Sequence, residues 1–177
     1  MLPEGYRIED LSPAHAPALG AAYRRNRRHL APWEPVRDES FYTDDGQVAA
    51  VAGQLAGARQ GQPTAWVVMQ ADQVVARVNL NNIVMGVLRS GSLGYWVDAD
   101  HQGRGLASAA VQHVCAHADA RGLHRVEAGT LLHNVASQRV LERCGFHEFG
   151  TAPSYLFIAG AWQDHRLYQR ILNDRPL

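Results

Sequence analysis

The chain has 177 residues, 46% of them hydrophobic and 19% charged, and its 17 Lys and Arg residues balance its 17 Asp and Glu residues. This length and composition are typical of one folded domain with its own core, and they exclude a largely disordered chain. The zero net charge argues against a nucleic-acid partner, which usually needs a basic excess.

The sequence indicates neither a membrane-spanning segment nor a disulfide framework. No apolar run approaches the ~18 residues of a membrane span, and the N-terminus lacks the pattern of a secretory leader. Two cysteines, Cys115 and Cys144, are too few for a disulfide framework, which favours a reducing compartment. We therefore predict a cytoplasmic protein in which residues 1–177 form a single domain. The sequence bears no mark of an oligomeric state.

Helices are expected to dominate the first 60 residues. Alternation, helix-start signals and turn formers predict, in chain order, a strand at 5–11, a helix from Ser12-Pro13 to about His29, a loop or broken helix at 29–45, and a helix at 46–60 that stops at Gly61 to Pro63. Four arginines at 24, 25, 27 and 28, together with His29, predict a solvated helix face.

Strands come next, and helices then alternate with them. The expected order is strands at 64–70, 74–83 and 92–98, a turn at 101–105, a helix at about 104–121, a strand at 124–132, a helix at 134–145 closed by Gly145, and closing strands around 146–150, 154–158 and 162–172. Helices first, an antiparallel meander and then a β-α-β-α unit indicate an α+β domain.

The clearest chemical signal is the strand, glycine-containing turn and helix of residues 94–111. Glycines let a backbone approach a ligand closely, and successive N–H groups at a helix start can cradle a pyrophosphate. The Arg104 side chain can add a charge-assisted contact. A Walker A loop is excluded because Gly-Lys-Ser/Thr is absent, and a Rossmann fingerprint because Ser108 stands where Gly or Ala is required. A tight turn without a ligand remains the alternative.

These residues resemble a known superfamily. The run Gln102 to Ala107 is similar to the Gln/Arg-x-x-Gly-x-Gly/Ala motif of the GNAT acetyltransferases, and Asn134 to Leu141, followed by Cys144-Gly145-Phe146, is similar to their second segment. More narrowly, residues 29–35, 80–96 and 155–165 resemble the ribosomal-protein N-acetyltransferases of the RimJ and RimL type. The likeness covers nearly the whole chain.

The resemblance implies a GNAT fold, a mixed and mostly antiparallel twisted sheet flanked by helices, with a splayed central strand pair that binds acetyl-CoA. It implies acetyl-CoA as co-substrate and no metal. Strand backbone would pair with the pantetheine arm, and the turn would take the pyrophosphate. The candidate coenzyme-binding residues are Trp96, Val97, Gln102, Gly103, Arg104, Gly105, Leu106, Ala107, Asn134 and Arg139; for Arg139, a surface ion pair is the alternative.

Acyl transfer to an amine needs a neutral nucleophile, a stabilised oxyanion and a proton for the leaving thiolate. The resemblance implies direct transfer without an acyl-enzyme. Ser137 is the candidate thiolate partner, with local helix capping as its alternative role. Tyr155 is the competing proton donor, with cross-strand packing as its alternative.

No general base stands out. The family's carboxylate is absent from residues 154–157, which leaves Glu34, Asp38, Glu39 and His133 as candidates. An α-amine with a pKa of about 8 costs about 1–1.4 kcal/mol to deprotonate at neutral pH, against about 4.6 for lysine. The lack of an obvious base therefore favours an α-amine acceptor.

The expected partners are acetyl-CoA and an amine acceptor, either a protein or peptide N-terminus or a small amine such as an antibiotic or polyamine. A CoA-binding module without catalysis is a further alternative. Trp33 and Asn81 are the candidate acceptor-binding residues, and for Trp33 a packing role is equally open.

Two other features are assigned structural roles. His113 and His117 are spaced as two zinc ligands on one helix face would be, but no third ligand is nearby, so a solvated face is expected. Cys115 and Cys144 are expected to be packed thiols.

Overall fold

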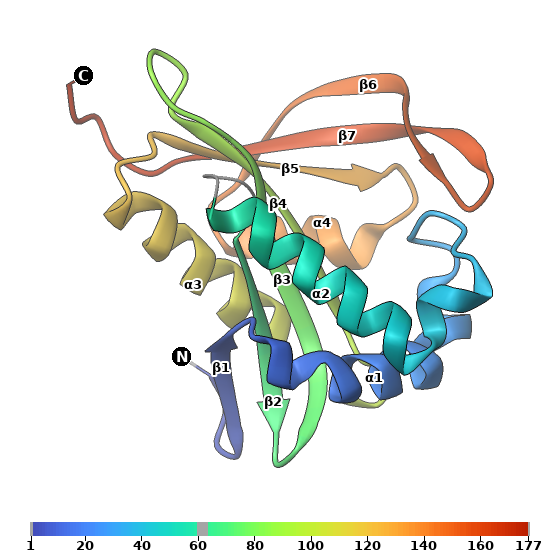
Figure 1. Ribbon diagram of the computed structural model, residues 1–177. Helices are drawn as coiled ribbons and strands as arrows, with labels where there is room; N and C mark the ends of the chain where they lie inside the picture. The colour runs from blue at the N-terminus through green and yellow to red at the C-terminus, as the bar shows by residue number, and fades with distance from the viewer. Residues whose placement is uncertain (1, 60–63, 177) are drawn as a thin grey trace.

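A computed structural model describes residues 2–59 and 64–176; the helix stop expected at Gly61 to Pro63 lies outside them. One seven-stranded sheet in the order β1-β2-β3-β4-β5-β7-β6 forms the centre of the molecule (Figure 1). Its neighbours pair antiparallel except β4 and β5, which are parallel. The expected α+β class and mostly antiparallel sheet are confirmed.

The strands are β1 Tyr6–Asp10, β2 Thr64–Gln70, β3 Gln73–Val84, β4 Ser90–Val97, β5 Arg125–Leu131, β6 His147–Ile158 and β7 Ala161–Ile171. The α-helices are α1 Ala16–Leu30, α2 Asp44–Arg59, α3 Leu106–Ala120 and α4 Val135–Arg143. Short 3-10 turns η1 Pro13–His15, η2 Glu39–Tyr42 and η3 Ala99–His101 connect them.

Apart from shifts of a few residues at other element ends, the structure departs from the sequence prediction at two places. The segments expected as two closing strands near 146–150 and 154–158 form one strand, β6, which shifts register twice against β7. The third helix begins at Leu106 instead of about 104, because Gly103 and Gly105 take left-handed φ angles of 72° and 78° that continue no right-handed helix. The helix end at Gly145 (φ 82°) is as predicted.

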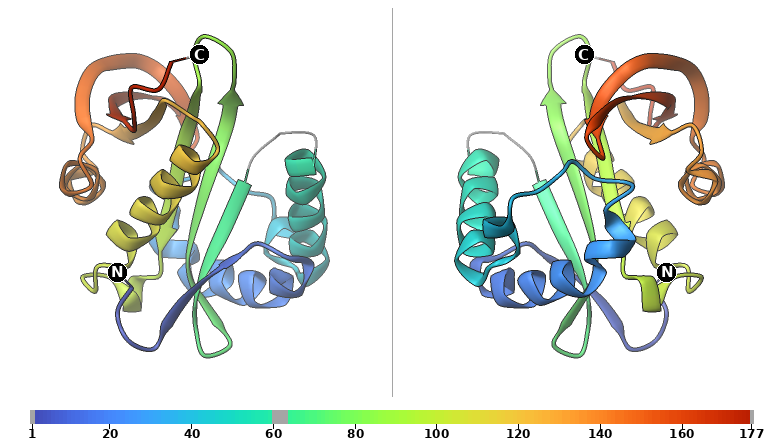
Figure 2. Two further views of the ribbon diagram at one scale, coloured as in Figure 1. Left: turned by 90° about the vertical axis from the view of Figure 1, so that its left-hand side faces the viewer. Right: turned by 90° about the vertical axis from the view of Figure 1, so that its right-hand side faces the viewer.

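The sheet separates two cores. Residues of β2 alternate between its faces, with Trp66 and Val68 in the core under α3, and Val67 and Met69 in the core under α1 and α2. Figure 2 shows α3 and α4 on one side of the sheet and α1 and α2 on the other. Burial on both faces explains why β2 is a continuous apolar run.

The paired histidines do not form a solvated face, so that prediction is wrong. His113 and His117 pack edge-on against Trp66, with ring centroids 5.5 and 4.8 Å away. Burial lowers the pKa of His117, which keeps its ring neutral. Within the described ranges, no group of His, Cys, Asp and Glu is arranged to hold a metal ion.

Both cysteines are buried free thiols, as predicted. Burial raises the pKa of Cys115 to about 11, so its reactive thiolate form is scarce. In residues 2–59 and 64–176, no helix is long and apolar enough to cross a bilayer.

An opening between β4 and β5 is the feature that positions the site. The two strands pair from Ser90 with Arg125 to Leu93 with Ala128, where the pairing ends. Both continue beyond it, β4 to Val97 and β5 to Leu131. The expected splayed pair is therefore present.

Candidate functional site

Two cavities lie at the splayed strands. The first, about 600 Å³, lies between the end of β4 and the starts of α3 and α4. The second, about 460 Å³, lies between β3, β5 and the segment after α1. Six residues line both cavities, and we call them the junction: Trp33, Glu34, Tyr95, Trp96, Asn134 and Ser137.

The first cavity contains most of the predicted coenzyme residues. Trp96 and Val97 line it from the free end of β4, and Gln102, Gly103, Gly105, Leu106 and Ala107 line it from the turn and the start of α3. A side chain added at Gly103 or Gly105 would meet no atom within 4 Å, so the cavity is open there. The positive end of the α3 dipole faces this space, which suits an anion.

Two arginines predicted to contact the coenzyme do not line this cavity. The Arg104 guanidinium donates to the Tyr6 hydroxyl at 3.0 Å and to the Asp100 carbonyl at 3.1 Å. Arg139 is exposed on α4, and Arg143, one turn further, lines the cavity instead.

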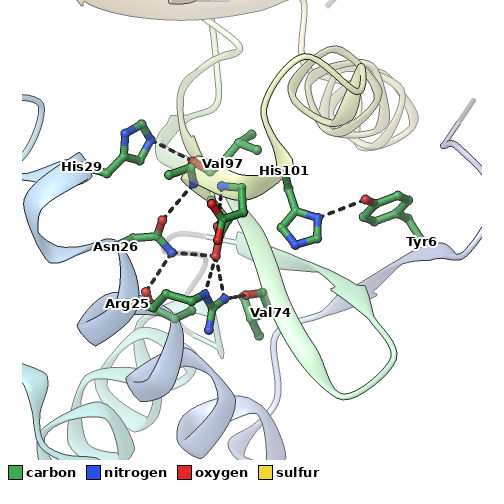
Figure 3. Close-up of polar contacts among 11 residues, drawn as sticks. Tyr6, Arg25, Asn26, His29, Val74, Val97 and His101 are labelled. Carbon is green, nitrogen blue, oxygen red and sulfur yellow. Dashed lines mark hydrogen bonds and ion pairs between the residues drawn. The ribbon is translucent and has the colours of Figure 1, made fainter.

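The end of β4 is held by a buried carboxylate. Asp98 is 1% exposed and accepts hydrogen bonds from Arg25 Nη2 at 2.6 Å, Asn26 Nδ2 at 2.7 Å and the Asp100 N–H at 3.0 Å. Figure 3 shows Arg25 and Asn26 reaching this point from α1. Burial acts to raise the pKa of Asp98, but the hydrogen bonds from Asn26, Asp100 and Arg25 outweigh it and leave the pKa below its usual value.

Replacing Asp98 with Asn is expected to lower the free energy of unfolding by about 2–3 kcal/mol, because charged hydrogen bonds to a buried group are lost. Since the folded pKa of Asp98 is depressed, this stabilisation is present above the unfolded pKa of about 3.9 and is lost as the pH falls through the folded pKa. Urea unfolding across that range should show the difference between the two proteins shrinking in acid. Exposed Asp100→Asn is the control; a constant difference at every pH would contradict this assignment.

The four arginines of the basic cluster on α1 are exposed, as predicted, but His29 is partly buried, so the predicted solvated face is wrong for His29. Arg25 holds Asp98, as described above. His29 Nε2 lies 3.2 Å from the Val97 carbonyl and 3.1 Å from Gln102 Nε2, and Figure 3 shows it beside Val97. With its proton, Nε2 donates to the Val97 carbonyl, and without it Nε2 accepts from Gln102. His29 therefore lies between the free end of β4 and the turn, which its position in an arginine run did not indicate.

A pair of hydroxyl groups lies at the junction. The Tyr95 hydroxyl and Ser137 Oγ are 2.7 Å apart. Asn134 Oδ1 accepts the Ser137 N–H at 3.1 Å and so caps α4. Burial raises the pKa of Tyr95 to about 12, which keeps its proton in place. Sequence reasoning missed Tyr95, although strand alternation places it on the face opposite Trp96.

Tyr155, the competing proton donor, lines neither cavity. It is 48% exposed on β6 and packs edge-on against His165 with ring centroids 5.5 Å apart. This is the packing role weighed for it from the sequence.

The four candidate bases occupy different environments. Only Glu34 lies at the junction, where it is partly buried. Glu39 forms an exposed ion pair with Arg27, Asp38 is exposed, and His133 lies on the exposed Trp33 ring with centroids 5.3 Å apart.

The two candidate acceptor residues are placed differently. Trp33 lines both cavities, whereas Asn81 lines neither. Asn79, two residues earlier on the same face of β3, lines the second cavity in its place.

Comparison with known proteins gives consistent results. A family model described as an acetyltransferase (GNAT) domain matches residues 7–147. The [ribosomal protein uS5]-alanine N-acetyltransferase of Escherichia coli (strain K12) is 34% identical over 152 residues, covering 84% of this chain and 78% of that protein.

Two solved structures are also similar at 31% sequence identity. The ribosomal-protein-S5-alanine acetyltransferase from Vibrio fischeri has a TM-score of 0.93, with 99% of this chain and 98% of that chain covered. Mycobacterium smegmatis RimJ in complex with CoA-disulfide has a TM-score of 0.89, with 94% and 81% covered.

Proposed function

Because the chain belongs to the GNAT acetyltransferase family, we propose that it transfers the acetyl group of acetyl-CoA to the α-amine of a protein or peptide. The observation that supports this most is the junction, where a cavity suited to the coenzyme meets a second cavity suited to the acceptor. A cytoplasmic location belongs to the same proposal, since both cysteines are free thiols.

In this proposal the first cavity holds acetyl-CoA. The pantetheine arm lies along the free end of β4, where Trp96 and Val97 have no partner in β5. The diphosphate lies at the backbone N–H groups between Gly103 and Ala107, favoured by the α3 dipole. This arrangement brings the thioester to the junction.

The Tyr95–Ser137 pair supplies the leaving-group proton. The amine nitrogen attacks the thioester carbonyl carbon, the tetrahedral intermediate collapses, and the C–S bond breaks with its electron pair on sulfur. The thiolate then takes a proton from the hydroxyl pair. The Tyr95 pKa of about 12 keeps its hydroxyl protonated at neutral pH.

The charges of the second cavity favour an α-amine over a polycationic acceptor. Its described lining has one carboxylate, Glu34, and two guanidinium groups, Arg37 and Arg77. Neither arginine forms an ion pair within the described residues. A polyamine or aminoglycoside would bring several positive charges against them, whereas a peptide N-terminus brings one.

Thiol release from acetyl-CoA tests this function. Peptides with free N-termini should release CoA thiol, and mass spectrometry should find the acetyl group on the α-nitrogen. Spermidine and an aminoglycoside should give little release. Faster reaction with either polycation would contradict the acceptor assignment, and no release with any amine would support a non-catalytic module.

Trp33→Ala is expected to raise the KM for a peptide acceptor about tenfold, which corresponds to ~1.4 kcal/mol of lost aromatic contact. The dissociation constant of acetyl-CoA should change less, because Trp33 lies at the junction, where the two cavities meet, and is not one of the turn residues. Steady-state kinetics and calorimetry measure the two quantities. Trp162→Ala, 64% exposed at the β7 start, is the matched control. An unchanged peptide KM in Trp33→Ala would assign Trp33 to packing alone.

A further inference from the structure

Glu34 is the carboxylate at the point where acceptor and thioester would meet. It follows α1 and lines both cavities. The other described residues that line the cavities include no second aspartate or glutamate. A cationic amine that approaches the junction therefore meets one negative side chain.

The main chain holds Glu34 in place independently of its carboxylate. Its carbonyl oxygen accepts the Ala159 N–H at 3.0 Å, which ties the segment after α1 to the β6–β7 hairpin. Figure 1 shows this segment beside the end of that hairpin. The carboxylate itself forms no ion pair with any described residue, so it is free to bind a ligand.

Burial raises the pKa of Glu34, and the positive charges of Arg37 and Arg77 oppose this effect without cancelling it. The other titratable groups that line the second cavity are Tyr23 on α1, Tyr95 on β4 and His165 on β7. A raised carboxyl pKa lies closer to that of an α-ammonium, near 8, which makes proton transfer between them less uphill.

We infer that the Glu34 carboxylate receives the ammonium group of the acceptor and removes the proton that blocks attack. This inference rests on the proposed function and names the residue that activates its nucleophile. The ammonium N–H bond breaks, the proton moves to a Glu34 carboxylate oxygen, and the nitrogen lone pair forms the new bond to the acetyl carbon. Glu34 later releases this proton to solvent. As the intermediate collapses, the nitrogen loses a second proton, which replaces the one that the hydroxyl pair gives to the thiolate. One net proton is therefore released per acetyl group transferred.

The test compares Glu34→Gln with wild type on a peptide acceptor across pH. At about pH 7 roughly a tenth of an α-amine is free, so a variant that can use only the free amine should lose about tenfold in kcat/KM. At about pH 9.5 nearly all of the amine is free, and the deficit should fall below about twofold. Glu34→Asp should recover part of the activity. Glu39→Gln, a glutamate exposed outside both cavities, is the matched control.

Acetyl-CoA affinity and thermal stability of Glu34→Gln should match wild type, because the segment is tied through its backbone. A full rate at about pH 7, a deficit that stays constant with pH, or an equal loss of acetyl-CoA affinity would each overturn the role of Glu34 while wild type still acetylates peptides. No peptide acetylation by wild type would instead contradict the proposed function, and the role of Glu34 with it.

Discussion

Gly105→Glu is expected to abolish detectable acetyl-CoA binding while leaving the fold intact. The Gly105 position opens into the first cavity, with no atom within 4 Å of an added Cβ. A carboxylate there would occupy the proposed diphosphate site. Two unit charges about 4 Å apart at an effective dielectric of about 20 repel by about 4 kcal/mol, or roughly 1,000-fold in affinity. Isothermal titration calorimetry with CoA measures this loss.

Gly105→Ala separates charge from backbone strain. Gly105 has a left-handed φ of 78°. Alanine in this conformation lowers the free energy of unfolding by about 1–2 kcal/mol. The alanine variant should therefore melt at a lower temperature but still bind CoA. If the glutamate variant and wild type bind CoA with equal affinity, the diphosphate does not bind at this turn.

Tyr95→Phe is expected to lower kcat about 100-fold, because the proton for the thiolate is supplied by the hydroxyl pair. Ser137→Ala should lower turnover more than coenzyme affinity for the same reason. The two hydroxyls lie 2.7 Å apart and act together, so the double variant should be little slower than the worse single one. Stopped-flow turnover and calorimetric affinity distinguish these effects.

Tyr155→Phe is the matched control, since it removes the same hydroxyl outside both cavities and should leave kcat nearly unchanged. If Tyr155→Phe lowers kcat and Tyr95→Phe does not, the proton donor is Tyr155 on β6. If Ser137→Ala loses acetyl-CoA affinity alone, Ser137 is a binding residue.

Most of the fold followed from local patterns. Alternation predicted β1, apolar runs bounded by turn residues predicted β2 to β4, and Gly145 marked the end of α4. The register of β6 did not follow, because it depends on pairing with β7: Ser154 takes a φ of 48° within the irregular stretch between Ala152 and Leu156. Such a local distortion is decided by tertiary contacts rather than by strand propensity.

The coenzyme turn was predicted because glycines and a helix start lie next to one another in sequence. The hydroxyl pair was not, because Tyr95 and Ser137 are 42 positions apart and meet only when α4 packs beside β4. The contacts of His29 and Arg25 were missed for the same reason: a run of basic residues gives no sign that Val97 and Asp98 lie opposite it. The backbone-based part of the site and single side chains such as Ser137 and Trp33 were therefore visible in the sequence, whereas the contacts between side chains of distant elements were not.

The central claim is that the thioester and the acceptor amine meet at the junction of the two cavities. Its most direct test is a co-crystal structure with a bisubstrate analogue, in which CoA is linked through an acetyl bridge to the α-nitrogen of a short peptide. We expect the diphosphate at the turn between Gly103 and Ala107, the bridge between Glu34 and the Tyr95–Ser137 pair, and the peptide in the second cavity. A bridge bound away from Tyr95 and Ser137, or a peptide outside the second cavity, would contradict this account.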